Sequence, residues 1–158
     1  MLTTAPPPRN SRHVHRSKVP DSVLRLTNDD LRKYWTLVGT TRSHCSGGSY
    51  SMIAMWSKGS RVAVGKNRLD RLAHTLDNGY PEISGVHAEL DLWRLNTDGL
   101  RGGTVYIAGT LSGTKSAMTN TRPCKYCVPI LMQLGIRHVV FSLDSEVTKC
   151  RVTDLVNS

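Results

Sequence analysis

Two short stretches, His87-Ala88-Glu89 and Pro123-Cys124-Lys125-Tyr126-Cys127, decide how the chain is expected to fold. Each places side chains that bind metals or carry protons at the expected start of a helix. Between them the sequence predicts a strand rich in β-branched residues. Neither stretch is specific alone, but together, in this order and around one strand, they predict a single metal site.

The spacing of the two cysteines supports that site. Cys124 and Cys127 are three residues apart, so on a helix both thiols would share one face and could bind one ion. Pro123 suits a first helical position, because the N–H that it lacks would be unpaired there. A helix N-terminus also favours the thiolate, which is the form that binds metal. His87, with Ser84-Gly85 as the expected helix start, would supply a third ligand.

Three protein ligands leave the fourth position of a tetrahedral zinc ion to water, which is typical of a catalytic site. Glu89 lies two residues beyond His87 and therefore points to another side of the helix. We interpret it as a proton carrier rather than a fourth ligand. The alternative is a structural zinc knuckle closed by Cys45 or Cys150, and the His-x-Glu partner makes catalytic zinc the preferred hypothesis.

The order H-x-E followed by P-C-x-x-C is the signature of zinc-dependent nucleobase deaminases. On these residues the chain resembles the cytidine/deoxycytidylate deaminase superfamily, which includes TadA and the AID/APOBEC-type nucleic-acid deaminases. The resemblance spans about residues 50–156. Gly65-Lys66-Asn67-Arg68 looks like the family's strand that ends in a substrate-binding Asn. The stretch 134–141 resembles its helix exit and fourth strand.

The resemblance implies an α/β three-layer sandwich with helices on both faces of a mixed five-stranded sheet. The last two strands are expected over 138–143 and 149–156, joined at Asp144-Ser145. So short a connection cannot hold a crossover helix, so these strands should pair antiparallel. Nucleoside cytidine deaminases have this hairpin, although their first metal ligand is usually Cys rather than His87. TadA and APOBEC relatives instead have a helix there and a parallel last strand.

The resemblance also implies the chemistry. Zn²⁺ held by His87, Cys124 and Cys127 would activate water for attack on C4 of cytosine. Glu89 would carry protons to the ring nitrogen and to the departing ammonia.

Substrate contacts follow from the same resemblance. Asn67 would bind the sugar or phosphate, the Ala88 N–H would bind a base carbonyl, and Pro123 would line the site. The basic residues expected to meet nucleic acid are Arg68, Lys115 and Arg122.

Hydrophobic periodicity predicts the elements before the first motif. A helix capped by Thr27 or Asn28 should bury a stripe at helical spacing. This stripe consists of Leu31, Tyr34, Trp35 and Val38. The runs 50–56 and 61–65, with a turn at Lys58-Gly59, predict a β-hairpin. An irregular loop is expected over 68–86.

The remaining elements carry the metal ligands. Helices are expected over 85–96 and 124–134, the second ending at Gly135. Pro129 should kink the second helix, because a proline beyond the first turn removes an intrahelical hydrogen bond. A strand over 104–108 should lead into a long substrate-contacting loop, 109–122.

Composition limits the class of protein. A chain of 158 residues fits one domain, which we expect over 21–158, behind a flexible basic arm at 1–20. The sequence has no run of 18 or more apolar residues and no apolar signal core, and its four cysteines fit a reducing compartment. We therefore expect a cytoplasmic protein, without membrane contact; the sequence does not indicate an oligomeric state.

The net charge of +9 favours a polyanionic substrate. The preferred hypothesis is deamination of cytosine in single-stranded DNA or RNA. The alternative is a metabolic deaminase of free deoxycytidylate or cytidine, and adenine in tRNA is a less favoured target. A non-catalytic module that retained zinc is the third hypothesis, and Glu89 argues against it.

Overall fold

The computed structural model describes residues 20, 22–44, 48–68 and 87–156. The N-terminal arm and most of the expected loop at 68–86 lie outside these ranges. The described elements, in chain order, are α1 (Asn28–Thr41), β1 (Tyr50–Lys58), β2 (Arg61–Lys66), α3 (Ala88–Leu95), β3 (Thr104–Leu111), α4 (Cys127–Leu134), β4 (His138–Leu143), β5 (Glu146–Arg151) and the 3₁₀-helix η2 (Val152–Leu155).

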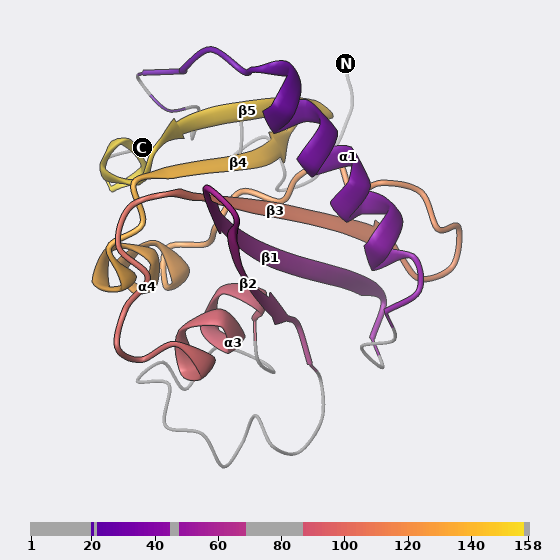
Figure 1. Ribbon diagram of the computed structural model, residues 1–158. Helices are drawn as coiled ribbons and strands as arrows, with labels where there is room; N and C mark the ends of the chain where they lie inside the picture. Colours follow the sequence, from indigo (N-terminus) through magenta and orange to yellow (C-terminus); the bar gives the residue numbers. More distant parts are fainter. Residues whose placement is uncertain (1–19, 21, 45–47, 69–86, 157–158) are drawn as a thin grey trace.

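The strands form one mixed sheet in the order β2-β1-β3-β4-β5. Only β3 and β4 are parallel, and the other neighbours, including β4 and β5, are antiparallel. α1 covers one face of the sheet, while α3 and α4 cover the other (Figure 1). The predicted three-layer sandwich, its mixed five-stranded sheet and its antiparallel last pair are thus confirmed.

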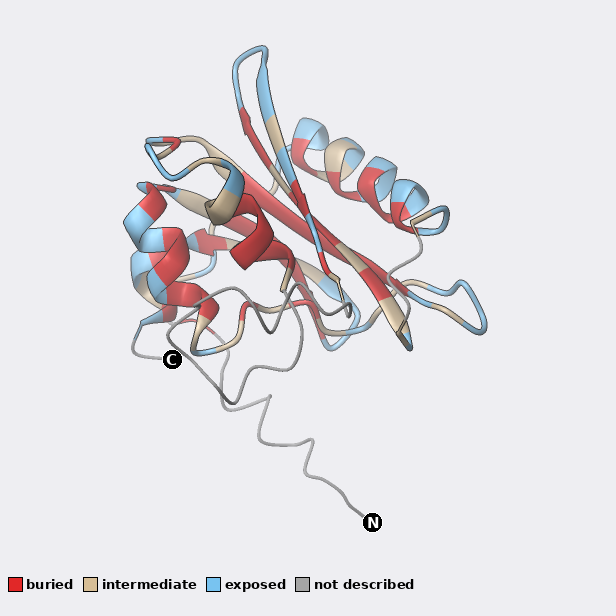
Figure 2. Cartoon of the chain, turned by 90° about the horizontal axis from the view of Figure 1, so that it is seen from below, coloured by how far each residue is buried: buried red, intermediate tan, exposed pale blue. Residues whose placement is uncertain are grey.

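β3 is the central strand and supplies both core layers. Its side chains alternate, so Val105 and Ile107 pack with α3 and α4, whereas Tyr106 and Ala108 pack under α1. All four are buried, and Figure 2 shows buried residues along the middle of the sheet, with exposed residues on the edge strands. A strand covered on both faces is expected to be a continuous apolar run, which is how this strand appears in the sequence.

The predicted hairpin is confirmed, with β1 and β2 paired from Ile53↔Lys66 to Lys58↔Arg61. Gly59 has φ +61° in the turn, a conformation that favours glycine. Gly65 lies directly on α3, where a Cβ atom would clash with the backbone of Ala88 and Leu92. Glycine at this position therefore lets the edge strand reach the helix.

α1 begins as predicted at Thr27, which forms a capping box with Asp30. The expected buried stripe was wrong for Trp35, which is 51% exposed, and only partly right for Leu31, which is half-buried, because the helix turns a different side to the sheet. That side consists of Asp30, Tyr34, Leu37, Val38 and Thr41.

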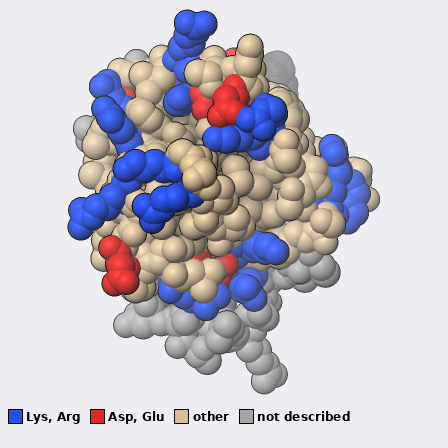
Figure 3. Space-filling model, viewed as in Figure 1, with Lys and Arg blue, Asp and Glu red and all other residues tan. Residues whose placement is uncertain are grey.

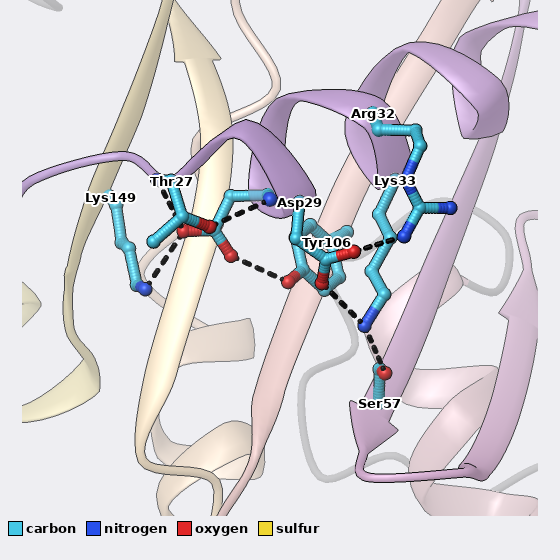
Figure 4. Close-up of polar contacts among 8 residues, drawn as sticks. Thr27, Asp29, Arg32, Lys33, Ser57, Tyr106 and Lys149 are labelled. Carbon is cyan, nitrogen blue, oxygen red and sulfur yellow. Dashed lines mark hydrogen bonds and ion pairs between the residues drawn. The ribbon is translucent and has the colours of Figure 1, made fainter.

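A polar network joins α1 to the sheet (Figure 4). The buried Asp30 carboxylate accepts hydrogen bonds from the Tyr106 hydroxyl at 2.7 Å and from Lys149 Nζ at 2.9 Å. Lys33 contacts Asp29 and donates to the Ser57 hydroxyl. The helix is therefore fixed to strands β1, β3 and β5.

The two helices of the metal motifs begin later than predicted. α3 begins at Ala88, with His87 as its N-cap; the expected start at Ser84-Gly85 lies outside the described residues. α4 begins at Cys127 rather than Cys124, so Pro123 precedes the helix instead of opening it. Pro129 is consequently the third helical residue, where no intrahelical hydrogen bond is lost and no kink is required. The end at Gly135 is confirmed, with φ +81°.

The long loop predicted over 109–122 is more ordered than expected. β3 continues to Leu111, and the chain then turns back so that Thr110 pairs with Ala117. The Leu111 N–H donates to the Ser116 carbonyl at 2.9 Å, and the Met118 N–H donates to the Gly109 carbonyl at 2.8 Å.

Thr121 ends this return and joins two strands. Parallel pairing of β3 with β4 covers only Thr104 to Tyr106. Beyond that point the Thr121 hydroxyl donates to the Ile107 carbonyl at 2.7 Å and accepts from the Ser142 N–H at 2.8 Å. A side chain thus takes the place of further pairing between the two strands.

The predicted bounds of the last strand were wrong. Asp144 and Ser145 both have positive φ, so a tight turn starts the pairing at Leu143↔Glu146. The strand ends at Arg151, and 152–155 form η2, which packs into the core on the side of α3 and α4. Within the described ranges, no helix is long and apolar enough to span a membrane.

Candidate active site

The three predicted metal ligands come together between α3 and α4. His87 Nδ1 lies 3.6 Å from Cys124 Sγ and 3.4 Å from Cys127 Sγ. The three atoms that could bind an ion all lie within 4.8 Å of one another. We call His87, Cys124 and Cys127 the metal group. Nowhere else in the described part of the chain do three His, Cys, Asp or Glu side chains form such a group.

These residues fit a zinc ion. Tetrahedral zinc, with bonds of about 2.3 Å to sulfur and about 2.0 Å to nitrogen, would separate the two kinds of ligand atom by about 3.6 Å. The observed separations of 3.4 and 3.6 Å match this value. Thiolate and imidazole also suit zinc better than magnesium or calcium, which prefer oxygen. Cys150, considered above as a closing ligand, is buried on β5 and does not belong to the group, and Cys45 lies outside the described residues.

Helix starts position the ligands. The His87 carbonyl accepts the first hydrogen bond of α3, from the Asp91 N–H at 2.9 Å. The Cys124 carbonyl accepts from the N–H groups of Cys127 and Val128, at 3.0 and 3.2 Å. This turn, rather than one helical face, brings the two thiols together.

The thiols and the imidazole are electrostatically coupled. A hydrogen bond from Cys127 and a further one from His87 lower the pKa of Cys124 to about 4, although burial opposes this. The thiolate at Cys124 in turn raises the pKa of Cys127 and of His87. Metal binding requires deprotonated thiols, and the lowered pKa of Cys124 favours its thiolate form.

Glu89 is 3% exposed and lies on the first turn of α3. Burial and the negative charge of Cys124 raise the pKa of its carboxyl group, and the carboxyl lies beside the Cys127 thiol. A buried carboxyl group beside such a cluster is placed to accept and release protons in a reaction there.

Of the residues predicted to bind substrate, Ala88 and Pro123 are chain neighbours of His87 and Cys124, and Asn67 is hydrogen-bonded to Tyr50. Asn67 is buried, accepts from the Met52 N–H at 2.7 Å and donates to the Tyr50 carbonyl at 3.3 Å, so it holds the end of β2 against β1. Ala88 is the first residue of α3, and Pro123 is buried immediately before Cys124.

The predicted basic contacts lie on three different segments. Arg68, 40% exposed, approaches the buried Asp91 at 3.5 Å. Asp91 also accepts from the Lys66 N–H at 2.9 Å. Lys115 is exposed on the turn after β3, whereas Arg122 is half-buried and donates to the Pro123 carbonyl at 3.3 Å.

Sequence reasoning missed Tyr50. Its ring is half-buried at the start of β1; burial raises its pKa, and the charges of Glu89, Cys124 and Cys127 raise it further. Tyr50 therefore belongs to the surroundings of the metal group. An aromatic residue at the start of an apolar strand has no distinguishing signal in the sequence.

The sheet order and its three layers define a cytidine-deaminase fold. The chain is similar to the crystal structure of cytidine deaminase from Burkholderia pseudomallei, with a TM-score of 0.53 and 16% identity over 82% of this chain and 96% of that one. At this identity the likeness shows a shared fold, as the resemblance of the motifs predicted.

Two further solved structures are similar at lower scores. The apo dCMP deaminase from cyanophage S-TIM5 has a TM-score of 0.44 and 16% identity, over 72% of this chain and 82% of that one. The cytidine deaminase from Mycobacterium tuberculosis has a TM-score of 0.43 and 19% identity, over 77% and 92%. No protein-family model and no curated protein sequence matches the chain.

Proposed function

We propose that the protein is a zinc-dependent hydrolase that converts cytosine to uracil. The observation that carries this proposal is the meeting of His87 Nδ1 and the thiols of Cys124 and Cys127 beside the buried carboxyl group of Glu89. His87, Cys124 and Cys127 would hold the ion, and zinc bound there supplies the Lewis acidity that makes water nucleophilic near neutral pH. Because the ligand thiols must stay reduced, we also propose a reducing, cytoplasmic location.

Glu89 performs the proton transfers. Its carboxylate accepts a proton from the attacking water and delivers it to N3 of the ring while oxygen bonds to C4. It then takes the remaining proton from the hydroxyl group now on C4 and donates it to the amino group, and the C4–N bond breaks to release ammonia as the C4 carbonyl forms. Burial keeps water from competing for these protons and keeps the pKa of the carboxyl group raised.

Three residues bind the substrate in this proposal. The Ala88 N–H, at the start of α3, donates to the base carbonyl, and Pro123 lines the pocket beside Cys124. Asn67 meets the sugar or phosphate. Its amide makes two hydrogen bonds to β1, and an Asn amide has capacity for four, so it can bind substrate without leaving the sheet.

Single-stranded DNA or RNA is the substrate form that we favour, because the described part of the chain carries an excess of positive charge. The described residues include 16 Lys and Arg but 8 Asp and Glu, an excess of eight positive charges. Arg68, Lys115 and Arg122 would meet phosphates. A single strand also presents a base without the cost of flipping it out of a duplex.

Free deoxycytidylate or cytidine is the second candidate. It is favoured by the antiparallel pairing of β4 with β5, the hairpin expected of nucleoside deaminases. The B. pseudomallei structure of the same fold is that of a cytidine deaminase.

Product analysis on three substrates tests both candidates. We expect zinc-loaded protein to form uracil, detected by mass spectrometry, in a single-stranded oligonucleotide with one cytosine. Deoxycytidylate and cytidine serve as parallel substrates, and an oligothymidylate is the blank. Turnover of the free compounds alone would move the assignment to the second candidate. No uracil from any of them, with zinc bound and the fold intact, would refute the deaminase proposal.

A further inference from the structure

A row of cationic side chains lies at the end of the sheet that is remote from the metal group. The candidate site adjoins Tyr50 and Asn67, where β1 begins and β2 ends. The opposite end is formed by the β1–β2 turn and by the starts of β3 and β4. β1 has nine residues, so about 27 Å of strand separates the two ends. The row consists of Lys58, Arg61, Arg101, Arg137 and Arg151, which we term the basic end.

The members of the basic end are contiguous. Lys58 pairs with Arg61 across the turn, and Lys58 Nζ donates to the Arg101 carbonyl at 3.3 Å. The Gly103 carbonyl accepts from the Arg137 N–H at 3.3 Å. Arg151 is paired with His138, the residue that follows Arg137. Figure 3 shows Lys and Arg side chains gathered on this side of the molecule, at the left of the view.

Acidic residues neutralise this surface only in part: Asp154 pairs with Arg151, and the exposed Asp98 stands three residues before Arg101. All five cations are exposed, and among the described residues the only ion pair that involves them joins Arg151 to Asp154 at 3.2 Å. Asp144 and Glu146 lie at the other end of the β4–β5 hairpin. Burial lowers the pKa of nearby His138, and the charges of Lys149 and Arg137 lower it further, which agrees with a positive local potential.

The backbone under the row is fixed. The Trp56 indole N–H donates to the Gly102 carbonyl at 2.9 Å, and the Arg61 guanidinium lies 5.2 Å from the centre of the same indole ring. Gly103 packs so closely that a Cβ atom would lie 2.7 Å from the Ser57 carbonyl oxygen. The cations therefore project from strand ends and tight turns, with little backbone freedom.

We propose that the basic end binds the phosphate backbone of nucleic acid, as a second binding surface apart from the metal site. Adjacent strands are about 4.8 Å apart, so cations at their ends form a row suited to successive phosphates. An anionic membrane would favour an amphipathic helix with apolar anchors, and no member of the row lies on a helix. Such phosphate binding is independent of base sequence.

This inference extends the proposed function to a larger nucleic-acid footprint, and its test measures binding rather than turnover. The probe is a fluorescent oligothymidylate, which has phosphates but no cytosine. Its affinity for the full chain is measured by anisotropy across a salt series. In R101Q/R137Q the log–log slope should become shallower by about 1.4, because each phosphate that the protein no longer neutralises reduces the slope by about 0.7. The lysine pair R101K/R137K should retain the wild-type slope.

A matched variant, R25Q/R32Q, removes two exposed cations beside and on α1 and should leave the slope unchanged. An equal reduction of the slope in both double variants would mean that only net charge matters and would overturn the proposal, as would an unchanged slope in R101Q/R137Q. Binding to phosphatidylserine vesicles that needs Arg101 and Arg137, without oligothymidylate binding, would assign the surface to membranes instead. Cytidine turnover by R101Q/R137Q reports separately on the metal site.

Discussion

At the scale of single residues, the two cysteines of the metal group are held by different backbone structures. Cys124 stands in a turn before α4, while Cys127 is the first residue of the helix. Cys124→Ser should nevertheless remove zinc, because one of the three ligands is lost. Zinc affinity should fall by more than about 10–100-fold, the loss typical when a residue that only contacts a ligand is replaced. Elemental analysis of purified protein measures it. Cys150→Ala is the control and should keep one zinc per chain; zinc loss in that variant would contradict the site described here.

Glu89 is predicted to act in the reaction without holding the metal. Glu89→Gln keeps the size of the side chain and removes the ionisable group. We expect zinc content to stay at the wild-type level and turnover of the best substrate to fall at least about 100-fold, because proton transfer is lost. Activity within a few-fold of wild type would show that another group carries the proton.

The surroundings of Asn67 and Tyr50 could not be predicted from the sequence. The clustering of His87, Cys124 and Cys127 could be predicted because metal binding requires fixed residue types at fixed spacing. The backbone hydrogen bonds of the Asn67 amide could not be foreseen, because they depend on the register of β1 and β2. Tyr50 became a site candidate only through its placement beside residues about 40 and 75 positions away in the chain.

At the scale of elements, the attachment of α1 depends on one buried carboxylate. Burial disfavours ionisation of Asp30, but hydrogen bonds from Thr27, Tyr106 and Lys149 outweigh it and lower its pKa to about 2. The folded pKa lies below the unfolded value of 3.8, so this stabilisation is present above pH 3.8 and is lost as pH falls toward 2.

Asp30→Asn should therefore lower the free energy of unfolding by about 2 kcal/mol at pH 7. Urea titrations between pH 2 and 7 should also show a weaker acid destabilisation than in wild type. Asp29→Asn, one residue away in exposed ion pairs with Arg32 and Lys33, should lower the free energy of unfolding much less than Asp30→Asn does. Equal effects of the two variants would argue against the buried network as the cause.

The contact between β2 and α3 depends on a missing side chain. Gly65→Ala would force a methyl group against the backbone of Ala88 and Leu92. We expect a loss of about 1–3 kcal/mol in stability, together with weaker zinc binding, because His87 lies at the same helix end. Gly39→Ala in α1 meets no atom within 4 Å and should be neutral or stabilising by up to about 1 kcal/mol. Thermal unfolding and zinc titration compare the two variants, and a neutral Gly65→Ala would refute the close packing.

Element boundaries show where sequence patterns were insufficient. Alternation identified the β1–β2 hairpin, and the short Asp144-Ser145 link identified the antiparallel last pair. Pro123 suggested a helix start, but the chain uses a turn there and places Pro129 in the first helical turn instead. Proline suits both positions for the same reason, so the pattern alone could not choose between them.

At the scale of the whole molecule, charge and chemistry occupy opposite ends of the sheet. The metal group lies where helices α3 and α4 begin, and the basic end lies at the other ends of the strands. Composition predicted the excess of positive charge but not its location, because the cations come from four separate turns and strand ends that only the sheet topology brings together.

Because the parallel pairing of β3 with β4 is short, we expect the domain to contain two cooperative units. Only three residue pairs join β4 directly to β3, whereas β1 and β3 share eight pairs. The Thr121 hydroxyl adds a bridge between Ile107 on β3 and Ser142 on β4. In Thr121→Val the hydroxyl is removed at nearly constant volume, and the Ser142 N–H no longer has its acceptor. Native-state hydrogen exchange should then show the Ser142 amide exchanging at least about fivefold faster, an opening easier by about 1 kcal/mol, while the Tyr106 amide is unaffected. Uniform acceleration across both strands would instead indicate one cooperative unit.

Thr121 lies three residues before Cys124 in the chain. Local opening of the β4–β5 hairpin would therefore also determine how quickly Cys124 can move away from a bound ion.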